Sequence, residues 1–186
     1  MTGPEPQNTS RSKPRRSFLF FRTAVTLPSL KAHAIFWSIT SAGLALDLWT
    51  KSAVFSWLHG KSPGYPLIDG FLTIVTTENP GAAFGIAYGL RPMLIIVSVI
   101  ALLAILGFFL LGNMRSTLAQ VALGLFAAGV CGNLYDRIFN YGLVRDFIDV
   151  VYWPGKHWPA FNIADSMLCI AVALLLISTY AADHKH

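Results

Sequence analysis

The stretch PAFNIADSMLCIAVALLLISTYAA, residues 159–182, is apolar almost throughout, yet it carries Asp165 close to its start. An apolar run of this length is typical of a helix that crosses a membrane, because a bilayer core about 30 Å thick needs about 20 helical residues. A carboxylate at the centre of such a helix costs about 2.5–3.5 kcal/mol on insertion scales. Asp165 therefore needs a purpose that offsets this cost.

Three more stretches have the length and composition of membrane helices. Residues 92–111 and 117–135 contain no charged residue, and residues 32–58 are apolar apart from His33, Asp47 and Lys51. The chain of 186 residues is only 12% charged, whereas a soluble domain carries about 25% charged residues. We therefore predict an all-α membrane domain over residues 32–183, with transmembrane helices at about 34–57, 91–111, 117–138 and 160–182.

Basic residues before the first helix set the expected orientation. Six Lys and Arg residues fall between residues 11 and 31, and cytoplasmic segments of membrane proteins carry an excess of such residues. We predict that residues 1–31 form a cytoplasmic extension, that both termini lie in the cytoplasm, and that segments 59–91 and 137–159 lie outside. The net charge of +5 then reflects topology, and we predict no nucleic-acid partner.

The first outer segment differs in composition from the helices. Residues 71–77, FLTIVTT, are rich in β-branched side chains, and the sequence ENPG that follows is a turn signal. We predict a small β element on the membrane surface. Asn79 lies in the turn, where it is a turn residue or an amide that holds substrate, and its spacing favours the turn.

Polar residues far apart in the sequence converge on the outer boundary of this topology. Asn133 and Asp136 share the spacing of Asn162 and Asp165, and residues three apart lie on one face of a helix. Solvation at a helix end is the simpler explanation for one such pair. Two pairs on the same side favour a functional site, because ionisable residues in membrane spans usually mark one.

Asp47 and Lys51 are spaced as a helical ion pair, four residues apart. We interpret them as a structural pair that neutralises two charges and fixes the first helix.

The sequence offers carboxylates and amides for chemistry, and we expect no metal and no cofactor. Two close carboxylates share a proton, so that the ionised one takes a proton from water while the protonated one donates to an amide carbonyl. Three acids compete for these two roles: Asp136, Asp146 and Asp165. Arg137 follows Asp136 directly, and as its partner it would hold Asp136 ionised and structural.

Two other classes of membrane protein fit the composition. A proton-coupled carrier would spread polar residues through the membrane depth, whereas here they cluster at one face and residues 92–111 are uncharged. A structural membrane subunit would leave the paired acids without a purpose.

Five motifs carry a resemblance to a known family. DLWTK, NPGAAFG, GNLYDR, RDFIDV and FNIADS follow one another between about residues 40 and 180, and in this order the chain resembles lipoprotein signal peptidase (signal peptidase II). The resemblance implies a bacterial aspartyl endopeptidase of the cell (inner) membrane. Such an enzyme removes signal peptides from diacylglyceryl-modified prolipoproteins at the extracytoplasmic face, cuts before the lipidated cysteine, contacts membrane lipid and is inhibited by globomycin.

The resemblance also implies roles for individual residues. Asp146 and Asp165 match the catalytic dyad of the family. The other matching residues line or support the site: Asn79, Asn133, Asp136, Arg137, Asn162, Asp47 and Lys51. One departure is Arg145, at a position that is commonly apolar in the family. A cation next to Asp146 is expected to favour its ionised form, which leaves the assignment of acid and base open.

Overall fold

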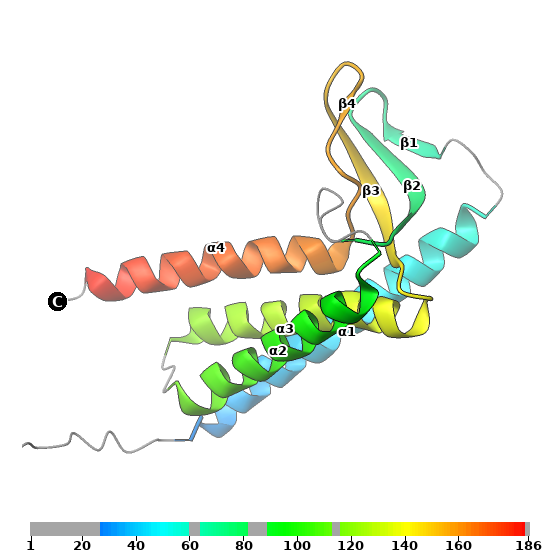
Figure 1. Cartoon of the computed structure of the whole chain (residues 1–186). Coiled ribbons are helices and arrows are strands. Elements are labelled where there is room, and N and C mark those ends of the chain that lie inside the picture. The colour runs from blue at the N-terminus through cyan, green and yellow to red at the C-terminus, as the bar shows by residue number, and fades with distance from the viewer. Residues whose placement is uncertain (1–26, 60–63, 82–88, 113–115, 185–186) are drawn as a thin grey trace, which may run out of the picture.

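The computed structural model describes residues 27–59, 64–81, 89–112 and 116–184, and within them the chain forms four long helices and one four-stranded sheet (Figure 1). The helices are α1 (Leu30–Trp57), α2 (Arg91–Leu111), α3 (Thr117–Phe139) and α4 (Ile163–Asp183). α1 begins before the predicted residue 34, because the Ser29 side chain caps it by accepting a 3.2 Å hydrogen bond from the Ala32 N–H. Most of the predicted basic extension lies outside the described residues.

α3 is the central helix of the bundle. Of its most apolar stretch 61% is buried, against 17% for the corresponding stretches of α2 and α4. Small residues on α3 permit close approach on two sides. A side chain at Gly124 would strike Ile39 of α1, and a side chain at Gly129 would strike Leu168 of α4.

An apolar core joins α3 to the first two helices. Phe36 of α1 stacks on Phe109 of α2 with ring centroids 4.2 Å apart, and both rings are buried together with Leu123 and Ala127 of α3. This packing fixes the three helices against one another near the start of α1 and the end of α2. Figure 1 shows these helix ends at the side of the bundle remote from the sheet.

Three helices among the described residues are long and apolar enough to cross a membrane: Arg91–Leu111, Thr117–Phe139 and Ile163–Ala181. α1 is longer than any of them, but it is not among the helices with a sufficiently apolar stretch, and it carries the buried residues Asp47 and Lys51. The fold is therefore mostly helical with three candidate spans and a small antiparallel sheet. A fourth span through α1 stays a prediction.

The sheet is built from both segments that were predicted to lie outside. β1 (Tyr65–Ile68) and β2 (Leu72–Asn79) come from the first segment, and β3 (Val144–Trp153) and β4 (Lys156–His157) come from the second. The sequence predicted the β element in the first segment and missed the second. β2 pairs antiparallel with β3, with Asn79 opposite Val144. Figure 1 shows the sheet at the end of the bundle where α1 and α3 end and α4 begins.

Candidate active site

Asp165 lies in a capping box at the start of α4. Asn162 is the cap residue: its Oδ1 accepts a 2.9 Å hydrogen bond from the Asp165 N–H, and Asp165 Oδ2 accepts one of 3.1 Å from the Asn162 N–H. Asp47 of α1 accepts the next free N–H of this turn, that of Ala164, at 2.9 Å. α4 therefore begins at Ile163 and not at the predicted residue 160. Asn162 and Asp165 form a cap, where the sequence had predicted two neighbours on one helical face.

The second oxygen of Asp165 is held by α3. Asn133 Nδ2 donates to Asp165 Oδ1 at 2.7 Å, and Asn133 Oδ1 accepts from Lys51 Nζ and from Asn162 Nδ2, each at 3.1 Å. An ammonium group can only donate. Lys51 therefore requires the oxygen of the Asn133 amide on its own side, and the amide nitrogen is turned toward Asp165.

Asp146 approaches the same place from β3. Its side chain is 2% exposed, Oδ1 accepts from Asn162 Nδ2 at 2.7 Å, and Oδ2 accepts from Asn79 Nδ2 at 3.1 Å. Burial and the nearby charge of Asp165 raise the pKa of Asp146 from 3.8 to about 7, while the two amide donors act in the opposite direction. Asn79 is also a turn residue, as its spacing favoured, because its Oδ1 accepts the Gly81 N–H at 2.9 Å.

Asp136 is held in a different cluster, and the prediction that Arg137 is its partner is wrong. Asp136 is fully buried and pairs with Arg145, whose Nη2 lies 2.7 Å from Oδ1, and with Lys51, whose Nζ lies 3.2 Å from Oδ2. Lys51 also pairs with Asp47 at 2.8 Å. Neighbours on a helix point about 100° apart, whereas strand β3 returns past the end of α3 and brings Arg145 back to Asp136.

The expected effect of Arg145 on Asp146 is also wrong. Successive side chains of a strand point to opposite faces, so the Arg145 guanidinium faces Asp136 while Asp146 faces Asn162. The pKa of Asp146 is raised by its burial and by the charge of Asp165, and Arg145 is not among the causes.

Arg137 lies on the side of the site formed by α3. Its Nη1 donates to Asn133 O at 3.3 Å and its Nη2 to Gly81 O at 3.1 Å. Among the described residues its buried Nε has no hydrogen-bond partner. Arg91 of α2, which the sequence analysis did not single out, donates from Nε to Arg137 O at 3.1 Å and holds this end of α3.

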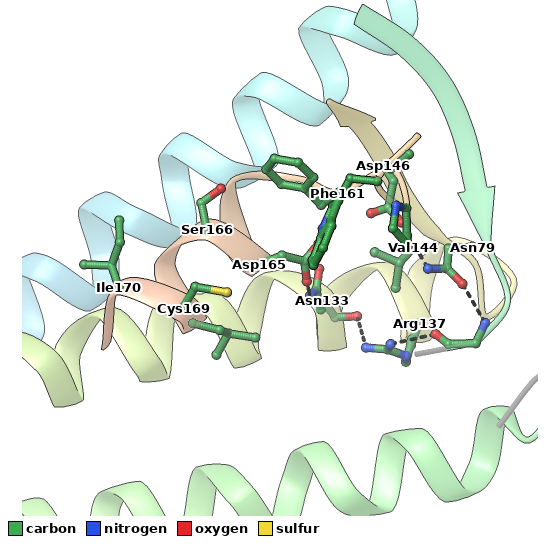
Figure 2. A pocket seen from close by; sticks show the side chains of 15 residues that line it. Asn79, Asn133, Arg137, Val144, Asp146, Phe161, Asp165, Ser166, Cys169 and Ile170 are labelled. Carbon is green, nitrogen blue, oxygen red and sulfur yellow. Dashed lines mark hydrogen bonds between the residues drawn. The ribbon is translucent and has the colours of Figure 1, made fainter. Parts of the chain in front are cut away.

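These side chains surround one end of a cavity of about 630 Å³ (Figure 2). In Figure 2 Asp146, Asn79 and Arg137 lie toward one side, and the lining continues past Ser166 and Cys169 to Ile170 along α4. The polar lining residues are Asn79, Asn133, Arg137, Asp146, Asp165 and Ser166. The apolar wall was not predicted as part of the site; it includes Val144, Trp158, Pro159, Phe161, Leu168 and Ile170. The cavity therefore combines a buried carboxylate, Asp146, and a half-buried one, Asp165, with room for an apolar ligand.

Of the three acids that competed for catalysis, Asp146 and Asp165 line the cavity and both bind Asn162, while Asp136 does not line it. No group of three His, Cys, Asp or Glu side chains that could hold a metal ion occurs in the described part of the chain. The arrangement can pass a proton between two carboxylates that are held by neutral amides.

Known proteins share this architecture and much of this sequence. The chain is 41% identical over 157 residues to a lipoprotein signal peptidase of Geobacter sulfurreducens, covering 82% of this chain and 96% of that protein. It is 44% identical over 158 residues to one of Syntrophus aciditrophicus, covering 80% and 94%. A solved bacterial membrane enzyme superposes with a TM-score of 0.72 at 34% identity, over 80% of this chain and 88% of the other.

The family match spans the whole site. Residues 39–181 fit the family model described as signal peptidase (SPase) II, and this range includes every site residue described above, from Asp47 to Asp165. The resemblance seen in the five sequence motifs is thereby confirmed. The chain belongs to the signal peptidase II family.

Proposed function

We propose that Asp146 and Asp165 are the catalytic dyad with which this signal peptidase II removes signal peptides from diacylglyceryl-modified prolipoproteins, cutting before the lipidated cysteine. One observation carries the assignment. Asn162 donates to Asp146 from its side chain at 2.7 Å and to Asp165 from its backbone at 3.1 Å, so a single residue ties the two carboxylates together at one end of the cavity.

The two carboxyl groups take different roles. Asp146 is almost fully buried and its pKa is raised to about 7, so it holds the shared proton at rest and acts as the acid. Asp165 is less buried and acts as the base that removes a proton from water. The resulting hydroxide attacks the scissile carbonyl carbon while Asp146 protonates the carbonyl oxygen. The protonated Asp165 then gives its proton to the amide nitrogen while Asp146 takes a proton back from a hydroxyl of the tetrahedral intermediate. The C–N bond breaks, a carboxyl group forms on the signal peptide, and the lipidated cysteine keeps the new amino group.

The rest of the cavity positions the substrate. The apolar wall of α4 offers a surface for the acyl chains of the lipidated cysteine, which would hold the scissile bond at the depth of Asp165 and so supply part of the rate through proximity. The Nε of Arg137, buried and without a partner in the described structure, is available to a substrate carbonyl. A globomycin-type inhibitor is expected to occupy the same cavity.

We further propose that α1 is a fourth span, with both termini in the cytoplasm and the site at the extracytoplasmic face of the inner membrane. Asp47 and Lys51 are both fully buried and paired at 2.8 Å, so they face the bundle interior and do not prevent α1 from contacting lipid. Single cysteines at positions 61 and 156, in a background without Cys131 and Cys169, should be labelled from the outer face. Position 61 lies outside the described residues, and position 156 lies on β4. Labelling from the cytoplasmic face alone would overturn this orientation.

The test of function is cleavage by the purified protein. A prolipoprotein carrying diacylglycerol on its cysteine should be converted to a shorter product on a gel, and the same precursor without lipid should not. Asp146→Asn and Asp165→Asn should each remain folded and lose cleavage. Asp149→Asn is the matched control, because Asp149 lies on the same strand, is paired with His157 at 2.9 Å and does not line the cavity. Normal cleavage by either dyad variant would refute the assignment.

A further inference from the structure

Arg145 forms hydrogen bonds with several elements around the site, through both its side chain and its backbone. Its backbone N–H donates to Asp136 Oδ2 at 3.0 Å, and its Nε and Nη2 donate to Asp136 Oδ1 at 3.1 and 2.7 Å. Its Nη1 lies 3.4 Å from Ser52 Oγ of α1, and its carbonyl accepts from Asn162 Nδ2 at 3.4 Å. One residue of β3 thus contacts α1, α3 and the cap of α4.

The turn before β3 makes these contacts possible. Tyr141 has φ of 52° and Gly142 has φ of 93°, so the chain reverses within two residues after the end of α3. A Cβ atom on Gly142 would lie 2.5 Å from Cδ of Arg91, which leaves glycine as the residue that fits. The reversal returns the chain to Asp136 nine residues further on, at Arg145.

The contact with Asp136 fixes the backbone as well as a side chain. Both the main chain and the guanidinium of Arg145 bind the same buried carboxylate, and a two-pronged contact of this kind restricts orientation more than a single hydrogen bond does. The next residue along the strand is Asp146. A shift of the strand at Arg145 would therefore move the Asp146 carboxylate away from Asn162.

We propose that Arg145 is a positioning residue for the dyad. By clamping the β3 backbone to Asp136 it sets the place at which the Asp146 carboxylate meets Asn162 and Asp165. This inference rests on the proposed function, and it adds a residue that acts through Asp136 and does not touch the substrate.

Three variants test it. Arg145→Met has similar length and no side-chain donor. Arg145→Lys keeps the charge and the backbone contact but cannot place two guanidinium N–H groups on Asp136 Oδ1. Lys156→Met removes one charge from the exposed strand β4 of the same sheet. A double variant, Asp136→Asn with Arg145→Met, tests the route. Kinetics are measured on lipidated prolipoprotein in detergent, across pH, with thermal unfolding of each protein measured in parallel.

We expect Arg145→Met to lower kcat by about tenfold to a hundredfold, the size of effect that a misplaced catalytic group produces, with KM little changed. Arg145→Lys should lose part of this rate. In both variants the alkaline limb of activity should move to higher pH, because weaker donation from Asn162 makes Asp146 harder to ionise. The double variant should be no slower than Asp136→Asn alone, and Lys156→Met should match the native enzyme.

Several results would overturn the inference. Native kcat and pH profile in folded Arg145→Met would do so, as would an equal loss in Lys156→Met, or losses that multiply in the double variant. If Arg145→Met does not fold, Arg145→Lys decides, and native kcat with a native pH profile in that variant would limit Arg145 to stability. Failure of the native enzyme to cleave lipidated prolipoprotein would instead refute the proposed function.

Discussion

Asp146→Asn should abolish cleavage and also change how the stability of the protein depends on pH. The pKa of Asp146 is raised to about 7 in the folded protein, above its ordinary value of 3.8. Between these values the folded state binds a proton that the unfolded state releases. The carboxyl group therefore contributes stability that is fully present below its unfolded pKa and is lost as the pH rises through the folded pKa.

The magnitude follows from the size of this shift. Each pKa unit corresponds to about 1.4 kcal/mol, so a rise from about pH 5 to pH 8 should remove about 2.5 kcal/mol from the native protein through this group. The amide of Asp146→Asn does not ionise in this range, so this variant does not lose this part of its stability as the pH rises. For a chain of this size each kcal/mol moves the unfolding midpoint by about 2–4 °C.

Thermal unfolding in detergent is the assay, with the midpoint recorded for both proteins at each pH. The midpoint of the native protein should fall relative to that of Asp146→Asn by about 5–10 °C over this range. Asp149→Asn, at an exposed ion pair with His157, should follow the native protein. Midpoints of the native and Asp146→Asn proteins that move in parallel would refute the reasoning.

Three further predictions follow from the same contacts. Asn79→Ala removes a donor that lowers the pKa of Asp146, so the alkaline limb of activity should move to higher pH, and an unmoved limb would contradict this role. Asp47→Asn breaks a buried pair with Lys51 and weakens the cap of α4, so it should cost about 3–5 kcal/mol of stability. It should lower the yield of folded protein more than the activity per folded molecule. A normal unfolding midpoint with turnover abolished would reverse this assignment. Cleavage should survive EDTA and 1,10-phenanthroline, and activity that is lost and then restored by zinc or magnesium would show that a metal takes part.

Composition determined most of the helical architecture in advance. The predicted helices at 91–111 and 117–138 end within a residue of α2 and α3, because long uncharged apolar runs leave few alternatives. The starts of α1 and α4 were misplaced because single side chains decide them: Ser29 caps one helix and Asn162 caps the other. A cap depends on local geometry that an apolar pattern does not contain.

The sheet was predicted only where its sequence is locally distinctive. β2 carries a run of β-branched residues, whereas β3 mixes charged and apolar residues and is held by pairing with β2, which is distant in the sequence. The contact between Asn79 and Asp146, with a separation of 67 residues, illustrates this distance. Once β3 is known to be a strand, the alternation of Arg145 and Asp146 between its faces follows. Spacing within the sequence did not identify the partner of Asp136, and it did not decide which two of Asp136, Asp146 and Asp165 form the dyad.

The acids around the site separate into two groups, one held in ion pairs and the other formed by the proposed catalytic pair. Asp47 and Asp136 pair with Lys51 and Arg145, two anions with two cations. These ion pairs join α1, α3 and β3, so this cluster is suited to fixing the elements around the site.

Asp146 and Asp165 differ from that cluster in the donors that they receive. In the hydrogen bonds of the described residues, every donor to these two carboxylates is an amide: Asn79, Asn133, or the side chain and backbone of Asn162. Neutral donors orient a carboxylate without fixing its charge, and neither carboxylate forms an ion pair with a described residue. Two close carboxylates of this kind favour a state that shares one proton. The proposed catalytic pair therefore differs from the other acids in the neutrality of its hydrogen-bond donors. Burial alone does not separate it, because Asp47, Asp136 and Asp146 are all nearly inaccessible.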